Sequence, residues 1–185
     1  MKIERTQVTK LTVSDIKGLD PISVFLEDLG PAAGRITIAC YTDSWTACWS
    51  SMGAQGIASF FCSFEPSYLA KNLSSIEFSV LDTDKLELLA KKAVKMLRKQ
   101  RDITAEDASD MLEQIEKGLT EPMEEGALLS RIFGEDWWRD LPTKAHPHYT
   151  YLCRIIQAVQ QALISSGTAT LSTETLKALV PYAPS

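Results

Sequence analysis

Both histidines of the chain lie within three residues of each other, at His146 and His148, and they form the densest pair of possible metal ligands. An extended His-Pro-His segment can present two imidazoles to one ion. Zinc sites use at least three protein ligands, however, and no third ligand is evident beside this pair. A polar entry to the helix expected from Tyr149 onward explains both side chains more simply, so we expect no metal here.

The four cysteines are the second group with possible chemistry, as metal ligands or disulfide partners. They lack the Cys-x-x-Cys spacing of zinc sites, which favours free thiols in a reducing compartment. Cys40 and Cys48 fall on opposite faces of a predicted hairpin, so they should neither pair nor share a metal. We expect four reduced thiols, with Cys40 on the buried face of a sheet and Cys153 on the buried face of a helix.

Catalytic motifs are sparse. Asp15-Ile16-Lys17 matches the D-x-K pattern of metal-dependent nucleases, but Glu4 is the only carboxylate that precedes it, and we interpret the match as chance. The chain has no glycine-rich phosphate-binding loop, no HExxH segment and no GxSxG elbow. We therefore expect no catalytic residue, no metal and no cofactor, and an enzyme is the less favoured class.

The elements that position these residues begin with strands. The stretch from Gly34 to Gly53 alternates apolar and polar residues with the period of a β-hairpin. The alternation favours a four-residue loop, Tyr41–Ser44. The predicted partners on the apolar face are Cys40 with Trp45, Ile38 with Ala47, and Ile36 with Trp49. Together with the two strand-like stretches before it, this hairpin predicts three or four antiparallel strands.

Helical spacing dominates from residue 57 onward. One helix is expected to break at Pro66, and residues 76–81 are expected to form a short strand. Asp84 with Glu87 and Thr104 with Asp107 resemble capping boxes that begin two further helices. Short and long helices are then expected over residues 128–133 and 149–164.

The predicted fold class is α+β, with a small antiparallel N-terminal sheet of three to four strands covered by C-terminal helices. Residues 1–166 are expected to form a single domain, strand-rich over 1–53 and helix-rich over 54–166. Residues 167–185 are expected to be a flexible segment with a short terminal helix. The hydrophobic content of 45% and the charged content of 23% are those of an ordinary globular protein.

Charge is distributed unevenly along the chain. Residues 73–101 contain seven Lys or Arg and four Asp or Glu, whereas residues 102–140 contain three and twelve. The basic run has Lys91, Lys95, Arg98 and Lys99 in one broad helical sector. This sector fits either a phosphate backbone or the acidic helix that follows. Because the whole chain has a net charge of −5, direct nucleic-acid binding is the less favoured of the two.

The acidic stretch also contains the adjacent tryptophans Trp137 and Trp138, within "GEDWWRDLP". Adjacent helical positions diverge by about 100°, so one indole should pack inward and the other should be partly exposed. An exposed tryptophan bordered by charge is typical of an interaction hot spot. An ordinary solvated helix face and a second core contact are the alternatives. The predicted partner-binding residues are Glu113, Glu116, Glu124, Glu125, Glu135, Asp136, Trp137 and Trp138.

Several segments resemble small accessory proteins of enterobacterial temperate phages and prophages, and the likeness spans roughly residues 8–163. The segments are "LDPISVFLEDLGPAAGRITIACY", "SWTACWSSMG", "FFCSF…YLAKNLSS", "DWW…LP" and "YLCRIIQAV". The resemblance implies a phage-encoded accessory protein in the host cytoplasm, rather than a part of the virion. It implies no activity and no catalytic residue, because none is assigned to the group.

Context and charge together favour a non-enzymatic protein that binds and modulates or inhibits a host protein, anti-phage defence proteins included. The eight predicted partner-binding residues would form an acidic and aromatic docking surface. A phage DNA-metabolism enzyme or a nucleic-acid-associated factor is the alternative. No run of about 18 apolar residues is present, so no membrane partner is expected. The sequence does not determine an oligomeric state.

Overall fold

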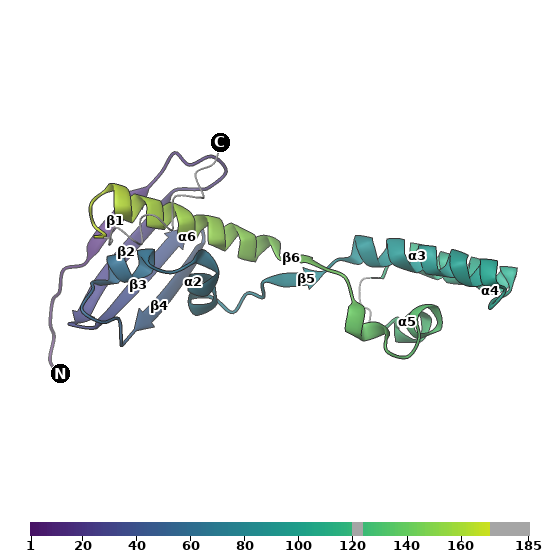
Figure 1. Ribbon diagram of the computed structural model, residues 1–185. Coiled ribbons are helices and arrows are strands. Elements are labelled where there is room, and N and C mark those ends of the chain that lie inside the picture. The colour runs from purple at the N-terminus through teal and green to yellow at the C-terminus, as the bar shows by residue number, and fades with distance from the viewer. Residues whose placement is uncertain (120–123, 171–185) are drawn as a thin grey trace. The chain divides into compact units, whose positions relative to one another are not determined.

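The structure is a computed structural model that describes residues 1–119 and 124–170, and the chain forms two compact units (Figure 1). Unit 1 combines the chain up to Glu77 with the chain from Pro147 onward, and unit 2 is Phe78–His146. Each unit has its own hydrophobic core. The expected single domain over residues 1–166 stays a prediction, and most of the expected terminal segment, from residue 171 on, lies outside the described residues.

Unit 1 contains a four-stranded antiparallel sheet in which each strand pairs with its neighbour in sequence. On β2, alternate residues from Ile22 to Leu26 are buried, as expected for a sheet with one covered face. The same alternation runs along all of β3. The strands are β1 (Thr9–Val13), β2 (Ile22–Gly30), β3 (Ala33–Cys40) and β4 (Asp43–Trp49). The predicted α+β class with its N-terminal antiparallel sheet is confirmed.

The predicted β3–β4 register is wrong by two residues. Ile38 lies opposite Trp45 and Cys40 lies opposite Asp43, so the loop is only Tyr41-Thr42. Tyr41 has a φ of 54°, the left-handed backbone that tight two-residue hairpin loops use at their first position. Because a shift of two residues keeps every side chain on its face, the predicted apolar face is nevertheless correct.

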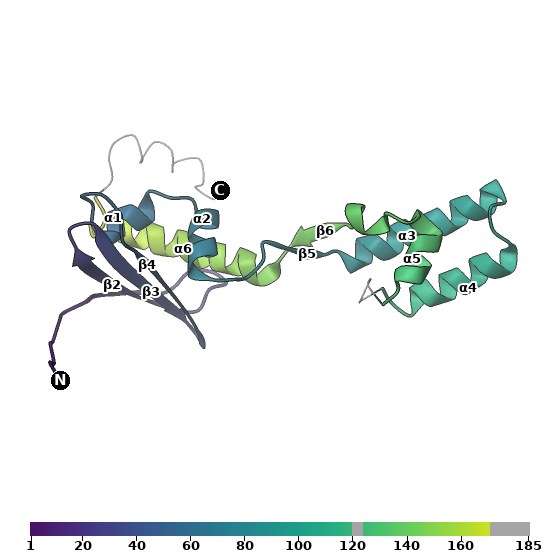
Figure 2. The ribbon, with the colours of Figure 1, turned by 90° about the horizontal axis from the view of Figure 1, so that it is seen from below.

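Three helices cover one face of the sheet, as Figure 2 shows, and none of the helices described in residues 1–77 and 147–170 lies on the opposite face. They are α1 (Ile57–Cys62), α2 (Pro66–Leu73) and α6 (Pro147–Ser165). Pro66 is at the start of α2, which confirms the predicted break. Asp28 of β2 accepts a hydrogen bond from the Ile57 backbone N–H at 2.9 Å, and this contact ties the start of α1 to the sheet.

Gln160 of α6 is the buried polar group that joins the helices. Its Nε2 donates to the carbonyl oxygens of Phe61 and Phe64, at 3.0 and 2.8 Å. These carbonyls lie at and beyond the end of α1, where a helix leaves acceptors without partners in its own backbone. Gln160 therefore provides hydrogen-bond donors to the carbonyl oxygens of the segment that connects α1 with α2.

Unit 2 consists of a two-stranded antiparallel ribbon and a helical cluster. The ribbon is β5 (Ser79–Leu81) with β6 (Thr143–Ala145), and the former is the predicted short strand. The helices are α3 (Thr83–Gln100), α4 (Ala105–Glu116), α5 (Gly126–Phe133) and the 3₁₀ turn η1 (Trp137–Asp140). Buried side chains of α3, α4 and α5 form one core, so these helices cover each other and α6 provides the late-chain cover of the sheet.

One of the two predicted capping boxes is present. Thr104 Oγ1 accepts from the Asp107 N–H at 3.1 Å, and Asp107 accepts from the Thr104 N–H at 3.3 Å. The predicted box of Asp84 with Glu87 is wrong, because α3 begins two residues earlier. Asp82 caps it by accepting from the Lys85 N–H at 3.2 Å.

Candidate partner-binding surface

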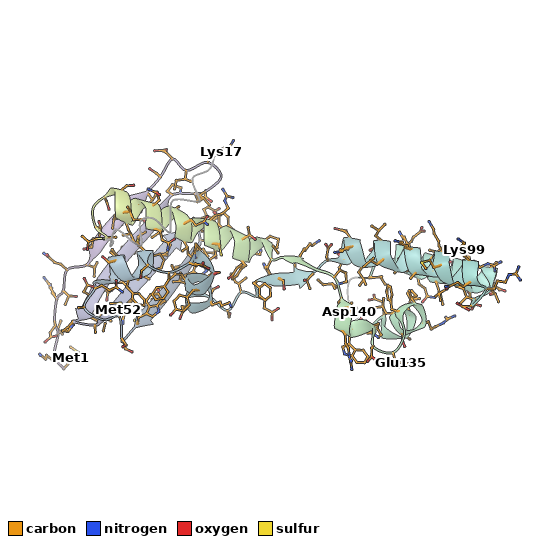
Figure 3. All side chains as sticks on the ribbon, in the orientation of Figure 1. Met1, Lys17, Met52, Lys99, Glu135 and Asp140 are labelled. Carbon is orange, nitrogen blue, oxygen red and sulfur yellow. The ribbon has the colours of Figure 1, made fainter. Side chains whose placement is uncertain are left out.

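The eight predicted partner-binding residues all lie in unit 2, and we call them the candidate surface. They come from three places: the second half of α4, the two residues that precede α5, and the segment from α5 into η1. Residues 120–123 stand between the first two places and are outside the described structure. Figure 3 labels Glu135 and, at the end of η1, Asp140.

Five of the six carboxylates are exposed, namely Glu113, Glu116, Glu124, Glu135 and Asp136. Two of the five are paired within their own segment. Glu113 binds Lys117 at 3.0 Å, and Asp136 binds Arg139 at 3.3 Å. Both pairs are solvent-exposed, where ion pairs contribute only about 0–1 kcal/mol. The negative charge of these side chains is thus only partly compensated locally.

The sixth carboxylate, Glu125, is partly buried, contrary to the exposure expected of a docking residue. Its Oε2 is buried without a hydrogen-bond partner in the described part of the chain. It lies beside a hollow of about 390 Å³ that Glu124, Lys117 and Leu128 also line.

The two tryptophans diverge as predicted. Trp137 is partly buried against the core of unit 2, and a Cβ on Gly126 would meet its ring at 3.4 Å. Trp138 is 50% exposed. Their rings meet edge to face, with centroids 6.3 Å apart, and the Arg139 guanidinium lies 5.9 Å from the Trp138 ring centroid. The anchored Trp137 indole thus supports the exposed Trp138 indole. Because this contact already restricts the Trp138 side chain, less conformational entropy is lost when Trp138 binds a partner.

The basic residues of α3 form no ion pair with the described carboxylates of the candidate surface. α3 and α4 pack through apolar side chains such as Leu86 and Met111. Lys91, Lys95, Arg98 and Lys99 form no ion pair within residues 1–119 and 124–170. In Figure 3, Lys99 lies on the α3 side of unit 2 and Glu135 on the α5 side. In the described part of the chain, α3 and α4 therefore pack through apolar side chains and not through ion pairs.

The cysteines all lie as free thiols, as predicted, with Cys40 buried. Cys153 is only partly buried, and Cys48 is exposed. Burial raises the pKa of the Cys62 thiol to about 12, which removes it from thiolate chemistry at neutral pH. Across the described ranges, no group of three His, Cys, Asp or Glu side chains is arranged to hold a metal ion.

One polar cluster, on the face of the sheet opposite α1, α2 and α6, was not predicted from the sequence. Arg35 donates from Nε to Cys48 Sγ at 3.2 Å and forms an ion pair with Glu27 at 3.3 Å. The hydrogen bond to Cys48 raises the pKa of the guanidinium, which stays charged throughout. The cross-strand pairing of Arg35 with Cys48 follows only from the observed register.

No helix in the described part of the chain is long and apolar enough to cross a membrane. A protein-family model described as a phage family, Phage_phiTE_072, matches residues 1–165. No curated protein and no solved structure matches the chain significantly. The match covers all of unit 2, unit 1 up to residue 165, and every residue of the candidate surface.

Proposed function

The chain belongs to this phage family, and from that premise we propose that it is a non-enzymatic accessory protein that binds a host protein through the candidate surface. Binding would modulate or inhibit the target, and anti-phage defence proteins are included in the proposed class. Enterobacterial temperate phages as the source, and the host cytoplasm as the place of action, are parts of the same proposal.

The observation that carries the proposal is Trp138, which is half exposed and has exposed carboxylates near it in sequence; none of these carboxylates forms an ion pair with α3. Interface hot spots favour tryptophan held in place by neighbours, and Trp137 provides that support. The surrounding carboxylates favour a partner with a basic patch, because opposite charges accelerate encounter. Many host proteins that act on nucleic acids carry such patches.

The experiment compares capture of host proteins by wild-type protein and by two variants of the candidate surface. In the first, Glu113→Lys, Glu116→Lys and Glu135→Lys are combined; in the second, Trp138→Ala stands alone. A matched control reverses three exposed carboxylates of unit 1, Asp43, Glu65 and Glu77, to lysine. We expect one host protein to be retained by wild type and control and lost from both surface variants.

For Trp138→Ala, the expected loss of affinity is about 2 kcal/mol or more, expressed mainly as faster dissociation. Folding should hardly change in the two charge-reversal variants, because the reversed carboxylates are exposed. Circular dichroism verifies this. Equal capture by wild type and both surface variants, or equal loss from the unit 1 control, would remove the candidate surface as the docking site.

A further inference from the structure

The outer side of α3 carries an apolar and basic stripe that the proposed function does not use. At 100° per residue, its members fall within about 100° of the helix circumference, opposite the buried Leu86, Ala90 and Val94. Leu88 is 68% exposed and Met96 is 53% exposed. We call this set the α3 stripe: Lys85, Leu88, Lys92, Lys95, Met96 and Lys99.

The lysines of the α3 stripe are exposed and form no ion pair with any described residue. Lysines alone would suit a phosphate backbone. Leu88 and Met96 would gain nothing there, because contacts along a phosphate backbone are electrostatic. An apolar centre bordered by cations suits a protein surface with an apolar centre bordered by carboxylates.

Unit 2 itself carries such a surface. Trp138 is 50% exposed and Phe133 is 40% exposed. Glu135, Asp136 and Asp140 surround them in sequence and are exposed. The two surfaces match in the sign of their charges and in having exposed apolar side chains. The α3 stripe and the surface around Trp138 are both exposed in unit 2. Within one chain, neither surface therefore covers the other.

We propose that a second copy of this chain is the occupant, with the α3 stripe of one copy docked on the Trp138 surface of the other. The pairing goes beyond the proposed function and requires no host protein. It also makes the α3 stripe a competitor of the host partner, because both would occupy Trp138. A host protein with a basic patch must then displace the second copy.

The test is sedimentation velocity of the full chain up to about 200 µM, in the concentration range of weak protein pairs. We expect association that rises with concentration at about 50 mM NaCl and weakens about tenfold or more at about 500 mM, because salt screens exposed charges. Lys95→Glu with Lys99→Glu should weaken association about tenfold or more. Glu135→Lys with Asp136→Lys should do the same.

An equimolar mixture of the two double variants should restore association, since each then offers the charge that the other lacks. The matched control, Lys17→Glu with Lys71→Glu, changes the net charge equally but lies in unit 1 and should associate as wild type does. A monomer at about 200 µM in low salt overturns the proposal. So does a mixture that fails to associate. A monomer that binds a DNA duplex, and loses it with Lys95→Glu and Lys99→Glu, would identify phosphate as the occupant instead.

Discussion

Replacing Gln160 with methionine should weaken unit 1 substantially, although no apolar core residue is lost. The Gln160 side chain is buried and donates to two carbonyl oxygens, those of Phe61 and Phe64. Methionine has a similar length but no donor, so both carbonyls lose their partner. A buried acceptor left unpaired costs about 1–3 kcal/mol.

The bond to Phe61 is fully buried and the bond to Phe64 only partly, so the second loss should be near the lower end of that range. The better burial of an apolar thioether offsets part of the cost. We expect the free energy of unfolding to fall by about 2–4 kcal/mol, a large share of the 5–15 kcal/mol typical of a domain.

Urea titration followed by tryptophan fluorescence measures this loss. Replacing Trp137 and Trp138 with phenylalanine leaves Trp45 and Trp49 as the only fluorescent indoles, and both lie on β4 of unit 1. The matched control is Gln161→Met, because the Gln161 side chain is exposed and, among the described residues, its amide bonds only Ser165 Oγ, at 3.1 Å. The reasoning is refuted if Gln160→Met lowers stability no more than Gln161→Met does.

Thr104→Ala should destabilise unit 2 by about 1 kcal/mol through loss of the cap. The hydrogen bonds from Thr104 lower the pKa of Asp107 in the folded state, so this difference should persist above about pH 4 and shrink in urea titrations at lower pH. At pH 8, a thiol reagent should label Cys48 in the folded protein and Cys62 only as fast as unit 1 unfolds, as mass spectrometry of the labelled peptides will show. Gly34→Val should lower the melting temperature, because a Cβ there would lie 2.8 Å from the Cβ of Ile57.

The fold was predictable from local patterns, but the pairing within it was not. Alternation places Ile36 and Ile38 on the buried face, yet its period of two leaves a shift of two residues undetected. The missing information was the left-handed backbone of Tyr41, which sequence does not predict for a tyrosine. The hydrogen bonds of Gln160 could not be predicted for another reason. Their acceptors, the carbonyl oxygens of Phe61 and Phe64, lie more than 95 residues away along the chain.

The candidate surface was predictable in outline. The spacing of the tryptophans predicts that one indole packs inward and the other is partly exposed, as found for Trp137 and Trp138. The ion pair of Glu113 with Lys117 has the i,i+4 spacing that favours such pairs, and it could have been anticipated. The burial of Glu125 could not, because it depends on how the chain enters α5.

The central claim is that exposed carboxylates of unit 2 steer a basic partner toward Trp138. The most direct test is the stopped-flow association rate of the captured host protein at several salt concentrations. For wild type, we predict a rate that falls steeply with added salt, and for the Glu113→Lys, Glu116→Lys, Glu135→Lys variant a slower rate with a weaker salt dependence. Identical rates and salt dependences for the two proteins would contradict the account.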